Sequence, residues 1–208
     1  LVAARERERL LILPVAPFSV HVYDAAVRQL AAALHLEQPA LPVPELLSAE
    51  PWGNEPELVE CLARAISPSL AHEGELVLTA HSLPQSVIDA GDPYDQQVRA
   101  LAASLQEKLG RRATLAYQSQ GASGGRWIGP PLRDVLEGLA KGGARRVVVA
   151  PVGFVTEHVE TLYDLDVEAA GWARELGLLW ERIPVPGTSP GFIAALEAVA
   201  RRGLREVA

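Results

Sequence analysis

Four carboxylates recur along residues 157–168 at spacings that place them on one side of a helix. Glu157, Glu160, Asp164 and Glu168 fall within about 80° of one another at 100° per residue. Neighbouring carboxylates in such a stripe repel each other, and a bound cation or a raised pKa on one of them relieves the repulsion. On its own the stripe is more typical of a solvated acidic face, with a site for metal ions or protons as the alternative.

Two further residues favour a site. His158 lies beside the stripe, and Asp166 falls within the apolar arc of the predicted helix, where a carboxylate without a partner is costly. An apolar, β-branched run at 147–152 precedes them and predicts a buried strand that ends in a turn. We therefore expect Thr156 to cap a helix over residues 156–176 at the carboxyl end of a strand.

Composition narrows the classes of protein. The 208 residues are 49% apolar, enough to bury a core as one domain or two small ones. The formal net charge of −7 argues against a nucleic-acid partner. No apolar run is long enough to span a membrane, and residues 1–9 are charged where a signal peptide would be apolar, so we expect a cytoplasmic protein. A single cysteine, Cys61, excludes an internal disulfide framework and any four-cysteine cluster.

Strands and helices are predicted to alternate along the chain. Strands are expected at 10–15, 75–80, 113–117, 146–152 and 178–183. Helices are expected at 24–36 (capped by Asp24), 55–67, 92–109, 131–141, 156–176 and 189–202, with a proline-rich loop carrying a short extended piece at 39–51 and a flexible glycine loop at 121–125. Four of the strands recur about every 35 residues, the length of a βα unit, which indicates a parallel sheet with helices on both faces.

Ligands of such sheets bind outside the carboxyl ends of the strands. Three of these ends are polar: His81-Ser82, Gln118-Ser119 and the turn at 153–160. A glycine-rich phosphate motif does not follow any predicted strand, which argues against a nucleotide ligand.

Several short motifs occur in an order that resembles one family. They are Ala80-His-Ser-Leu-Pro84, Gly91-Asp-Pro-Tyr94, Tyr117-Gln-Ser119, Trp127-Ile-Gly-Pro130, Pro151-Val-Gly-Phe154 and Glu157-His-Val-Glu-Thr-Leu-Tyr-Asp164, preceded by Pro17-Phe-Ser19 and Glu50-Pro-Trp52. In order and spacing they resemble the ferrochelatases, over nearly the whole chain. The resemblance implies an enzyme that inserts ferrous iron into a porphyrin, protoporphyrin IX or coproporphyrin III, in haem biosynthesis.

The resemblance also implies a fold. We expect an α/β protein of two Rossmann-like, chelatase-type domains with parallel sheets flanked by helices and the macrocycle between them. Residues 1–69 with 184–208 are expected to form the first domain, and residues 70–183 the second, which carries the metal-site residues. The family's opening segment has no counterpart in this sequence, so we expect the first domain to be incomplete and the true N-terminus to be absent. A monomer is expected.

Roles carry over by resemblance to matching positions. His81 and Glu160 match the residues that handle pyrrole protons and metal across the porphyrin site, and Asp164 and Glu168 match an outward line of acids where an auxiliary divalent cation such as Mg²⁺ can sit. Expected substrate-binding residues are Ser82, Gln118, Ser119, Trp127 and His158. The chain departs from the family pattern at Glu157, where members usually carry Asp. Beyond substrate Fe(II) no cofactor is required, and the single cysteine excludes the iron–sulfur cluster of some members.

The residue types suit this chemistry. A neutral histidine accepts a proton near neutral pH, and Fe(II) accepts imidazole and carboxylate ligands together. Plainer interpretations stay open: His81 as a structural histidine, Gly91–Tyr94 as a helix start, Trp127 packed on its own domain, and His21, His35 and His72 as surface groups. The alternative functions are a non-catalytic haem- or metal-binding module, a related cobalt or nickel tetrapyrrole chelatase and, with little support, a metallohydrolase using His81, His158 and Glu160.

Overall fold

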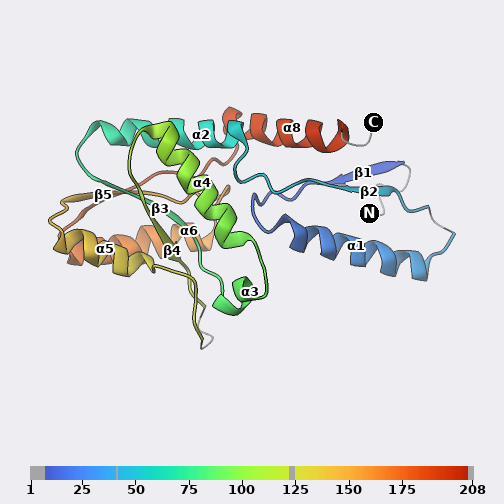
Figure 1. Ribbon diagram of the computed structural model, residues 1–208, viewed down its shortest axis with the longest axis horizontal. Coiled ribbons are helices and arrows are strands. Elements are labelled where there is room, and N and C mark those ends of the chain that lie inside the picture. Colours follow the sequence, from blue (N-terminus) through green and yellow to red (C-terminus); the bar gives the residue numbers. More distant parts are fainter. Residues whose placement is uncertain (1–7, 41, 122–124, 206–208) are drawn as a thin grey trace.

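Two parallel sheets organise the chain, as Figure 1 shows for a computed structural model that describes residues 8–40, 42–121 and 125–205. The smaller sheet pairs β1 (Arg9–Ile12) with β2 (Glu45–Ser48). The larger has the order β4-β3-β5-β6, from β3 (Glu75–His81), β4 (Thr114–Gln118), β5 (Arg146–Ala150) and β6 (Leu179–Arg182). The pairings between these six strands are all parallel, which confirms the predicted α/β fold.

The larger sheet is buried on both faces because its central strands are almost entirely apolar. Alternate side chains of β3 and β5 enter two separate cores. Leu76, Leu78 and Val148 pack into one core with α2 (Pro56–Ile66), α4 (Tyr94–Leu109) and α8 (Pro190–Arg205). Val77, Val147 and Val149 pack into the other with α5 (Leu132–Lys141) and α7 (Ala170–Glu175). Helices therefore cover both faces of the sheet, as the βα spacing predicted (Figure 1).

The smaller sheet lies between two helices. In Figure 1, α1 (Val20–Glu37) runs along one side of β1 and β2, and α8 runs along the other. The C-terminal part of α8 comes so close that a Cβ on Gly203 would lie 2.8 Å from Leu11. Arg202 of α8 also pairs with the buried carboxylate of Glu55, just before α2. The last helix thus joins the small sheet to the helices on the large one.

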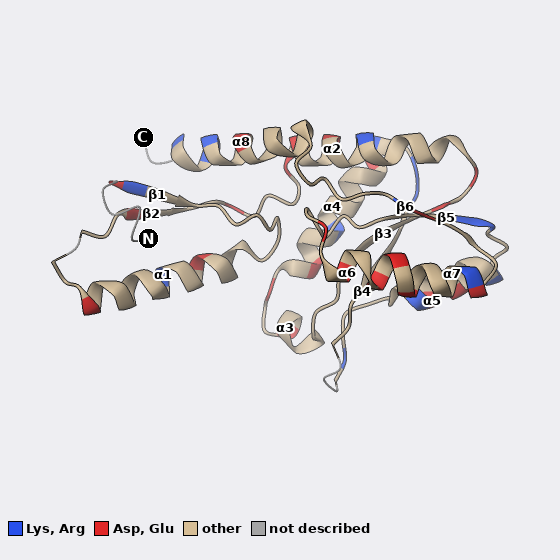
Figure 2. Ribbon diagram, turned by 180° about the vertical axis from the view of Figure 1, so that it is seen from behind, with Lys and Arg blue, Asp and Glu red and all other residues tan. Residues whose placement is uncertain are grey.

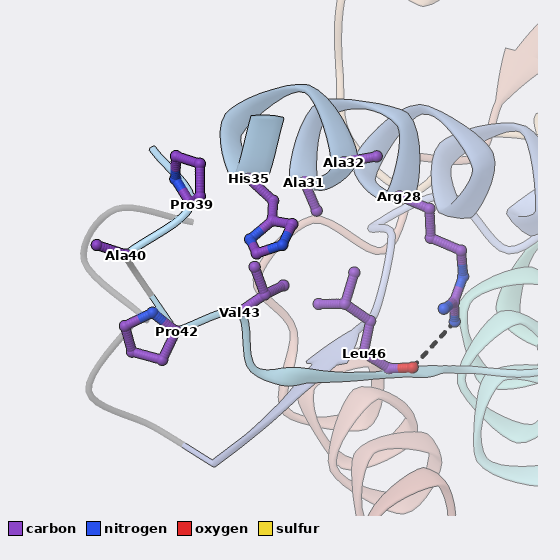
Figure 3. A pocket seen from close by; sticks show the side chains of 9 residues that line it. All are labelled: Arg28, Ala31, Ala32, His35, Pro39, Ala40, Pro42, Val43 and Leu46. Atoms are coloured by element: carbon purple, nitrogen blue, oxygen red, sulfur yellow. Dashed lines mark hydrogen bonds between the residues drawn. The ribbon is translucent and has the colours of Figure 1, made fainter. Parts of the chain in front are cut away.

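Helix α1 makes few buried contacts, since only Val20 and Ala31 among its residues are buried. Its attachment to the sheet is largely polar. Arg28 donates to the carbonyl of Leu46 on β2 at 3.0 Å and to the hydroxyl of Ser48 at 2.6 Å. Beside these contacts lies a cavity of about 690 Å³, shown in Figure 3, lined mainly by small and apolar side chains of α1 and of the loop before β2.

Some predicted boundaries were wrong. Helix α1 begins at Val20 rather than at Asp24, because Asp24 lies inside the helix and pairs with Arg28. The predicted helix over 156–176 is three segments: α6 (Val159–Leu162), a π-helix (Asp164–Ala169) and α7. Within the predicted loop at 121–125, residues 122–124 lie outside the described residues. Two short helices were not predicted, a 3₁₀ helix (Ser67–Ala71) and α3 (Gln85–Asp89).

Two further points concern the whole chain. The predicted division into domains, 1–69 with 184–208 and 70–183, is not tested by the strand pairing and stays a prediction. Throughout the described ranges, every helix is either too short or too polar to cross a lipid bilayer.

Candidate functional site

The turn after β5 crosses directly over the end of β3. The backbone N–H of Gly153 donates to the carbonyl of Thr79 at 3.0 Å, and a Cβ on Gly153 would lie 2.7 Å from Ala80. Real Cβ atoms are essentially never this close to other heavy atoms, so only glycine fits. This contact places the segment that carries His158 and Glu160 above the strand end that carries His81.

His158 caps α6, the role that we predicted for Thr156. The Nδ1 atom of His158 accepts from the backbone N–H of Glu160 at 3.3 Å. In return, Thr161 exchanges two hydrogen bonds with the backbone of His158, at 3.0 and 2.9 Å. Thr161 is fully buried, so this reciprocal cap fixes the first turn of the helix and with it the position of Glu160.

His81 and Glu160 face one another, as the resemblance predicted. The Nε2 atom of His81 lies 3.1 Å from Oε1 of Glu160, and the two side chains are 30% and 38% exposed. The Nδ1 atom of His81 contacts the carbonyl oxygen of Ser82. A carbonyl can only accept, so Nδ1 carries a proton, and a hydrogen bond from Nε2 to the carboxyl then requires one proton between the two groups.

His158 approaches the same carboxylate less closely. Its Nδ1 atom lies 3.8 Å from Oε2 of Glu160, but the lone pair of Nδ1 already accepts the N–H of Glu160. We therefore treat the contact as an approach rather than a hydrogen bond. The ring of Phe154 lies 4.9 Å from the imidazole of His158 and fixes its orientation.

These groups line a cleft of about 360 Å³ between the two sheet units. One wall comes from the β1–α1 loop and the start of α1, including Phe18, Ser19 and Tyr23. The facing wall carries His81, Leu83, Tyr94, Phe154, His158 and Glu160. A flat, largely apolar ligand placed here would meet a histidine and a carboxylate on one side and aromatic side chains on both.

Sequence reasoning missed several of these cleft residues. Phe18 and Tyr23 lie between a predicted strand and a predicted helix, in residues to which we assigned no element, and we interpreted Tyr94 as part of a helix start. The motif Pro17-Phe-Ser19 was a usable signal for the first of them, since it is short and apolar beside a strand end. Only the fold brings it to the cleft.

The acidic stripe is divided between two clefts. Asp164 and Glu168 line a second hollow of about 490 Å³, with Gln118, Ser119, Asp134 and Trp172. The hydroxyl of Ser119, a residue with a φ of 60°, donates to the carboxylate of Asp164. Figure 2 shows the acidic positions along the segment from α6 to α7. The 100° periodicity predicted one line of acids, and the π-helix breaks that line because its hydrogen bonds run from i to i+5.

The apolar arc opposite the stripe is only partly buried. Leu165, Ala169 and Ala173 are fully buried, whereas Val159, Leu162 and Tyr163 are 71%, 49% and 53% exposed. Asp166, which we placed inside this arc, is exposed and makes two hydrogen bonds to Arg182, at 2.5 and 2.9 Å. The same guanidinium binds Glu157 at 2.9 Å. Asp166 and Glu157 therefore clamp Arg182 and do not contribute to the site.

The remaining predicted site residues differ in their placement. Ser82 is fully buried and its hydroxyl donates to the carbonyl of Ile128 at 2.8 Å, and contact between this residue and substrate stays a prediction. Gln118 is only 5% exposed, and its amide donates to the carbonyl of Glu160 at 3.1 Å. Trp127 forms an isolated bridge with Pro84 and does not line either cleft described above.

The pair offers two side chains of the kinds that ligate metals. Among the described residues, no group of three or more His, Cys, Asp or Glu side chains is arranged as a metal site. An imidazole beside a carboxylate nevertheless offers the two ligand types that Fe(II) accepts. Metal contact by His81, Glu160, Asp164 and Glu168 stays a prediction.

Comparisons with known proteins identify the family of the chain. The model of the ferrochelatase family matches residues 2–204. The ferrochelatase of Synechococcus sp. (strain JA-3-3Ab) is 36% identical over 203 residues, which cover 93% of this chain and 59% of that protein. The coproporphyrin III ferrochelatase of Anoxybacillus flavithermus is 33% identical, over 91% of this chain and 61% of that protein. The chain thus spans about half the length of the curated relatives it matches.

A solved structure shows the same fold. SirB from Bacillus subtilis with Fe3+ aligns with a TM-score of 0.68 over 97% of this chain and 73% of that one. The two sequences are 15% identical, so the likeness concerns the fold alone. The family match, in contrast, includes His81, Glu160 and every motif discussed above, and it shows that this chain belongs to the ferrochelatase family.

Proposed function

We propose that the protein is a ferrochelatase, which inserts Fe(II) into a porphyrin in haem biosynthesis. The observation that carries the proposal is the 3.1 Å contact between Nε2 of His81 and the Glu160 carboxyl inside a cleft with aromatic walls. Relatives named as ferrochelatase and as coproporphyrin III ferrochelatase both support it. Protoporphyrin IX and coproporphyrin III are therefore the two substrates to test.

The reaction requires protons to leave as the metal enters. Two pyrrole N–H protons are lost, and the resulting porphyrin dianion binds Fe²⁺ to give a neutral centre. Nε2 of His81, which lines the cleft, accepts one pyrrole proton after the proton shared with Glu160 has passed to water, and it accepts the second after the first has in turn been released to water. Glu160 stabilises the imidazolium that forms and offers its carboxylate to the incoming iron. General-base catalysis of this kind contributes about 10²–10⁴-fold to a rate.

The second cleft supports a separate proposal for an auxiliary cation. Asp164 and Glu168 line it together with Ser119, and carboxylate and hydroxyl oxygens are suitable ligands for a hydrated divalent ion such as Mg²⁺. One cysteine, Cys61, cannot ligate an iron–sulfur cluster within this chain, and we propose none. A cytoplasmic location and a monomeric state stay predictions of the sequence.

The test is anaerobic Fe(II) insertion with each porphyrin offered separately. We expect turnover with one or both porphyrins, and a loss of about 100-fold or more in His81→Ala and in Glu160→Gln. The same substitutions at remote positions, His35→Ala and Glu197→Gln, serve as matched controls. Porphyrin binding without metallation by the unsubstituted protein would contradict the proposal and indicate a binding module. Insertion of cobalt or nickel but not iron would indicate a related chelatase.

A further inference from the structure

Two buried side chains hold the backbone of the catalytic pair from beneath. The phenol of Tyr94 donates to the carbonyl of His81 at 2.9 Å, and the amide of Gln118 donates to the carbonyl of Glu160 at 3.1 Å. We propose that Tyr94 and Gln118 are positioning residues that act together to fix the separation between His81 and Glu160. The inference rests on the function proposed above.

The side chains of the pair are not themselves well enclosed. His81 and Glu160 are 30% and 38% exposed, and a carboxylate in contact with water has several rotamers of similar energy. Their relative position therefore depends on how firmly each backbone segment is held. Since a displacement of about 1 Å in a catalytic group can cost 10²-fold in rate, anchors on the two carbonyls bear directly on catalysis.

Tyr94 is well placed for this role. It is 7% exposed, and burial raises the pKa of its phenol far above the ordinary value, so that the hydroxyl remains a donor throughout the working pH range. Its backbone N–H is held by the carboxylate of Asp92 at 2.9 Å. Its ring meets that of Phe18 edge to face, with centroids 5.8 Å apart, and Phe18 belongs to the opposite wall of the cleft. Tyr94 thus joins the His81 carbonyl to both walls.

Gln118 serves the other partner. It lies opposite His81 in the register of β3 and β4, and its side chain is 5% exposed. The Glu160 carbonyl can only accept, so the orientation of the amide is determined: Nε2 points to Glu160 and Oε1 points away. That Oε1 atom is buried, and within the described part of the chain no group forms a hydrogen bond with it. A buried oxygen without a hydrogen bond lowers the stability of the fold, so stability does not account for a glutamine at this position. The hydrogen bond from Nε2 to the Glu160 carbonyl does account for it.

The experiment is a double-mutant cycle with Tyr94→Phe and Gln118→Met. Each substitution removes one donor and keeps the shape and the apolar contacts. We expect kcat for Fe(II) insertion to fall about tenfold in each variant, with the porphyrin KM within about twofold of the original. We expect the double variant to lose less than the product of the single losses, because both anchors act on one separation. The side chains of Tyr94 and Gln118 do not bond to each other, so a smaller loss in the double variant would mean that their effects are coupled through His81 and Glu160.

Tyr117→Phe is the matched control. Tyr117 is also buried, and its hydroxyl donates to Asp95 on α4, away from the His81 carbonyl. The control should lower stability while kcat per folded protein stays unchanged. Equal kcat in Tyr94→Phe, Gln118→Met and the control would overturn the proposal, as would full additivity in the double variant.

An NMR measurement tests the positioning role independently of whether the protein inserts metal. The imidazole ¹⁵N resonances of His81, assigned by their absence in His81→Ala, report its tautomer and hydrogen bonds without any turnover. They should move in Tyr94→Phe and Gln118→Met but not in Tyr117→Phe. If the unsubstituted protein does not insert metal, the proposed function fails while these shifts still decide the positioning role. Unchanged His81 resonances in both anchor variants would refute it.

Discussion

Gly153 touches Ala80 with no room for a side chain between them. A Cβ on Gly153 would lie 2.7 Å from both Cα and Cβ of Ala80, which are part of a central strand and cannot yield. The residues on either side of this contact, His81 and the turn that leads to Glu160, form the pair. The close contact between the turn after β5 and the end of β3 thus determines where the base of the cleft lies.

Gly153→Ala is therefore expected to be harmful to both stability and activity. The added methyl group overpacks the crossing and lowers the free energy of unfolding by about 1–3 kcal/mol. It also lifts the turn away from β3, so iron insertion should fall even in the folded protein. Urea unfolding and single-turnover kinetics would measure the two effects. Gly171→Ala is the control, since nothing lies within 4 Å of a Cβ at that helical position and the change should be neutral or stabilising.

Thr161→Val tests the cap of α6. Valine keeps the buried shape but removes both hydrogen bonds to the backbone of His158, so we expect a loss of about 1 kcal/mol in unfolding free energy. The first turn also carries Glu160, and kcat should fall with it. Thr156→Val, the same change at an exposed threonine, should leave stability unaltered. Equal stability of the two variants would show that the cap is unimportant.

Arg182→Met tests the clamp that binds Glu157 and Asp166. We expect a loss of about 1–2 kcal/mol at pH 7, because the guanidinium is 13% exposed and the two carboxylates would lose their partner. The loss should depend on pH through Glu157. Burial raises the pKa of that carboxyl, but hydrogen bonds to Thr161 and Arg182 and the charge of Arg182 outweigh it and hold the pKa below its usual range.

The direction of this pH dependence follows from proton linkage. A carboxyl with a lowered folded pKa adds stability above its unfolded pKa, roughly 4.3, and loses it as the pH falls through the folded value. The difference in unfolding free energy between the original protein and Arg182→Met should therefore be largest near pH 7 and shrink below about pH 4. A difference that grew on acidification would contradict this account.

Arg28→Met tests the attachment of α1 to the small sheet. Figure 3 shows the guanidinium beside the cavity, bonded to the carbonyl of Leu46, and Ser48 and Asp24 are its other partners. Since α1 has few buried residues, loss of these bonds should increase hydrogen exchange along α1 and β2 while leaving β3 and β5 protected. Arg201→Met, which removes an exposed pair within α8, is the control. If hydrogen exchange along α1 and β2 were the same in Arg28→Met as in the control, apolar contacts alone would be enough to hold α1 on the small sheet.

Much of the larger sheet could be predicted because a buried strand is recognisable from its own consecutive apolar residues. Strands such as Val147 to Ala150 are apolar throughout, and turn residues mark their ends, so the number of strands in the larger sheet and their parallel direction followed from the sequence. The motif around His81 likewise led to its partner Glu160, since His81 ends β3, Glu160 lies in the helix that follows β5, and the resemblance supplied their pairing.

Other features depend on tertiary contacts and are not visible in the local sequence. The π-helix at Asp164–Ala169 has the composition of an α-helix, and only its hydrogen bonds reveal that the acids turn to different sides. Asp166 gave a misleading signal because its partner, Arg182, lies on a strand distant in sequence. Tyr94 was interpreted as a helix start, which it is, while its hydroxyl bond to His81 depends on tertiary packing.

The division of the acids between two clefts has a consequence for inhibition. Glu160 borders one cleft and Asp164 the other, with the buried Gln118 between the Glu160 backbone and the second hollow. A ligand in the second cleft would leave the first cleft free, which under the function proposed above is the cleft that binds the porphyrin. Cations or small molecules that bind beside Asp164 would then act as noncompetitive modulators, changing the maximal rate without competing for the macrocycle.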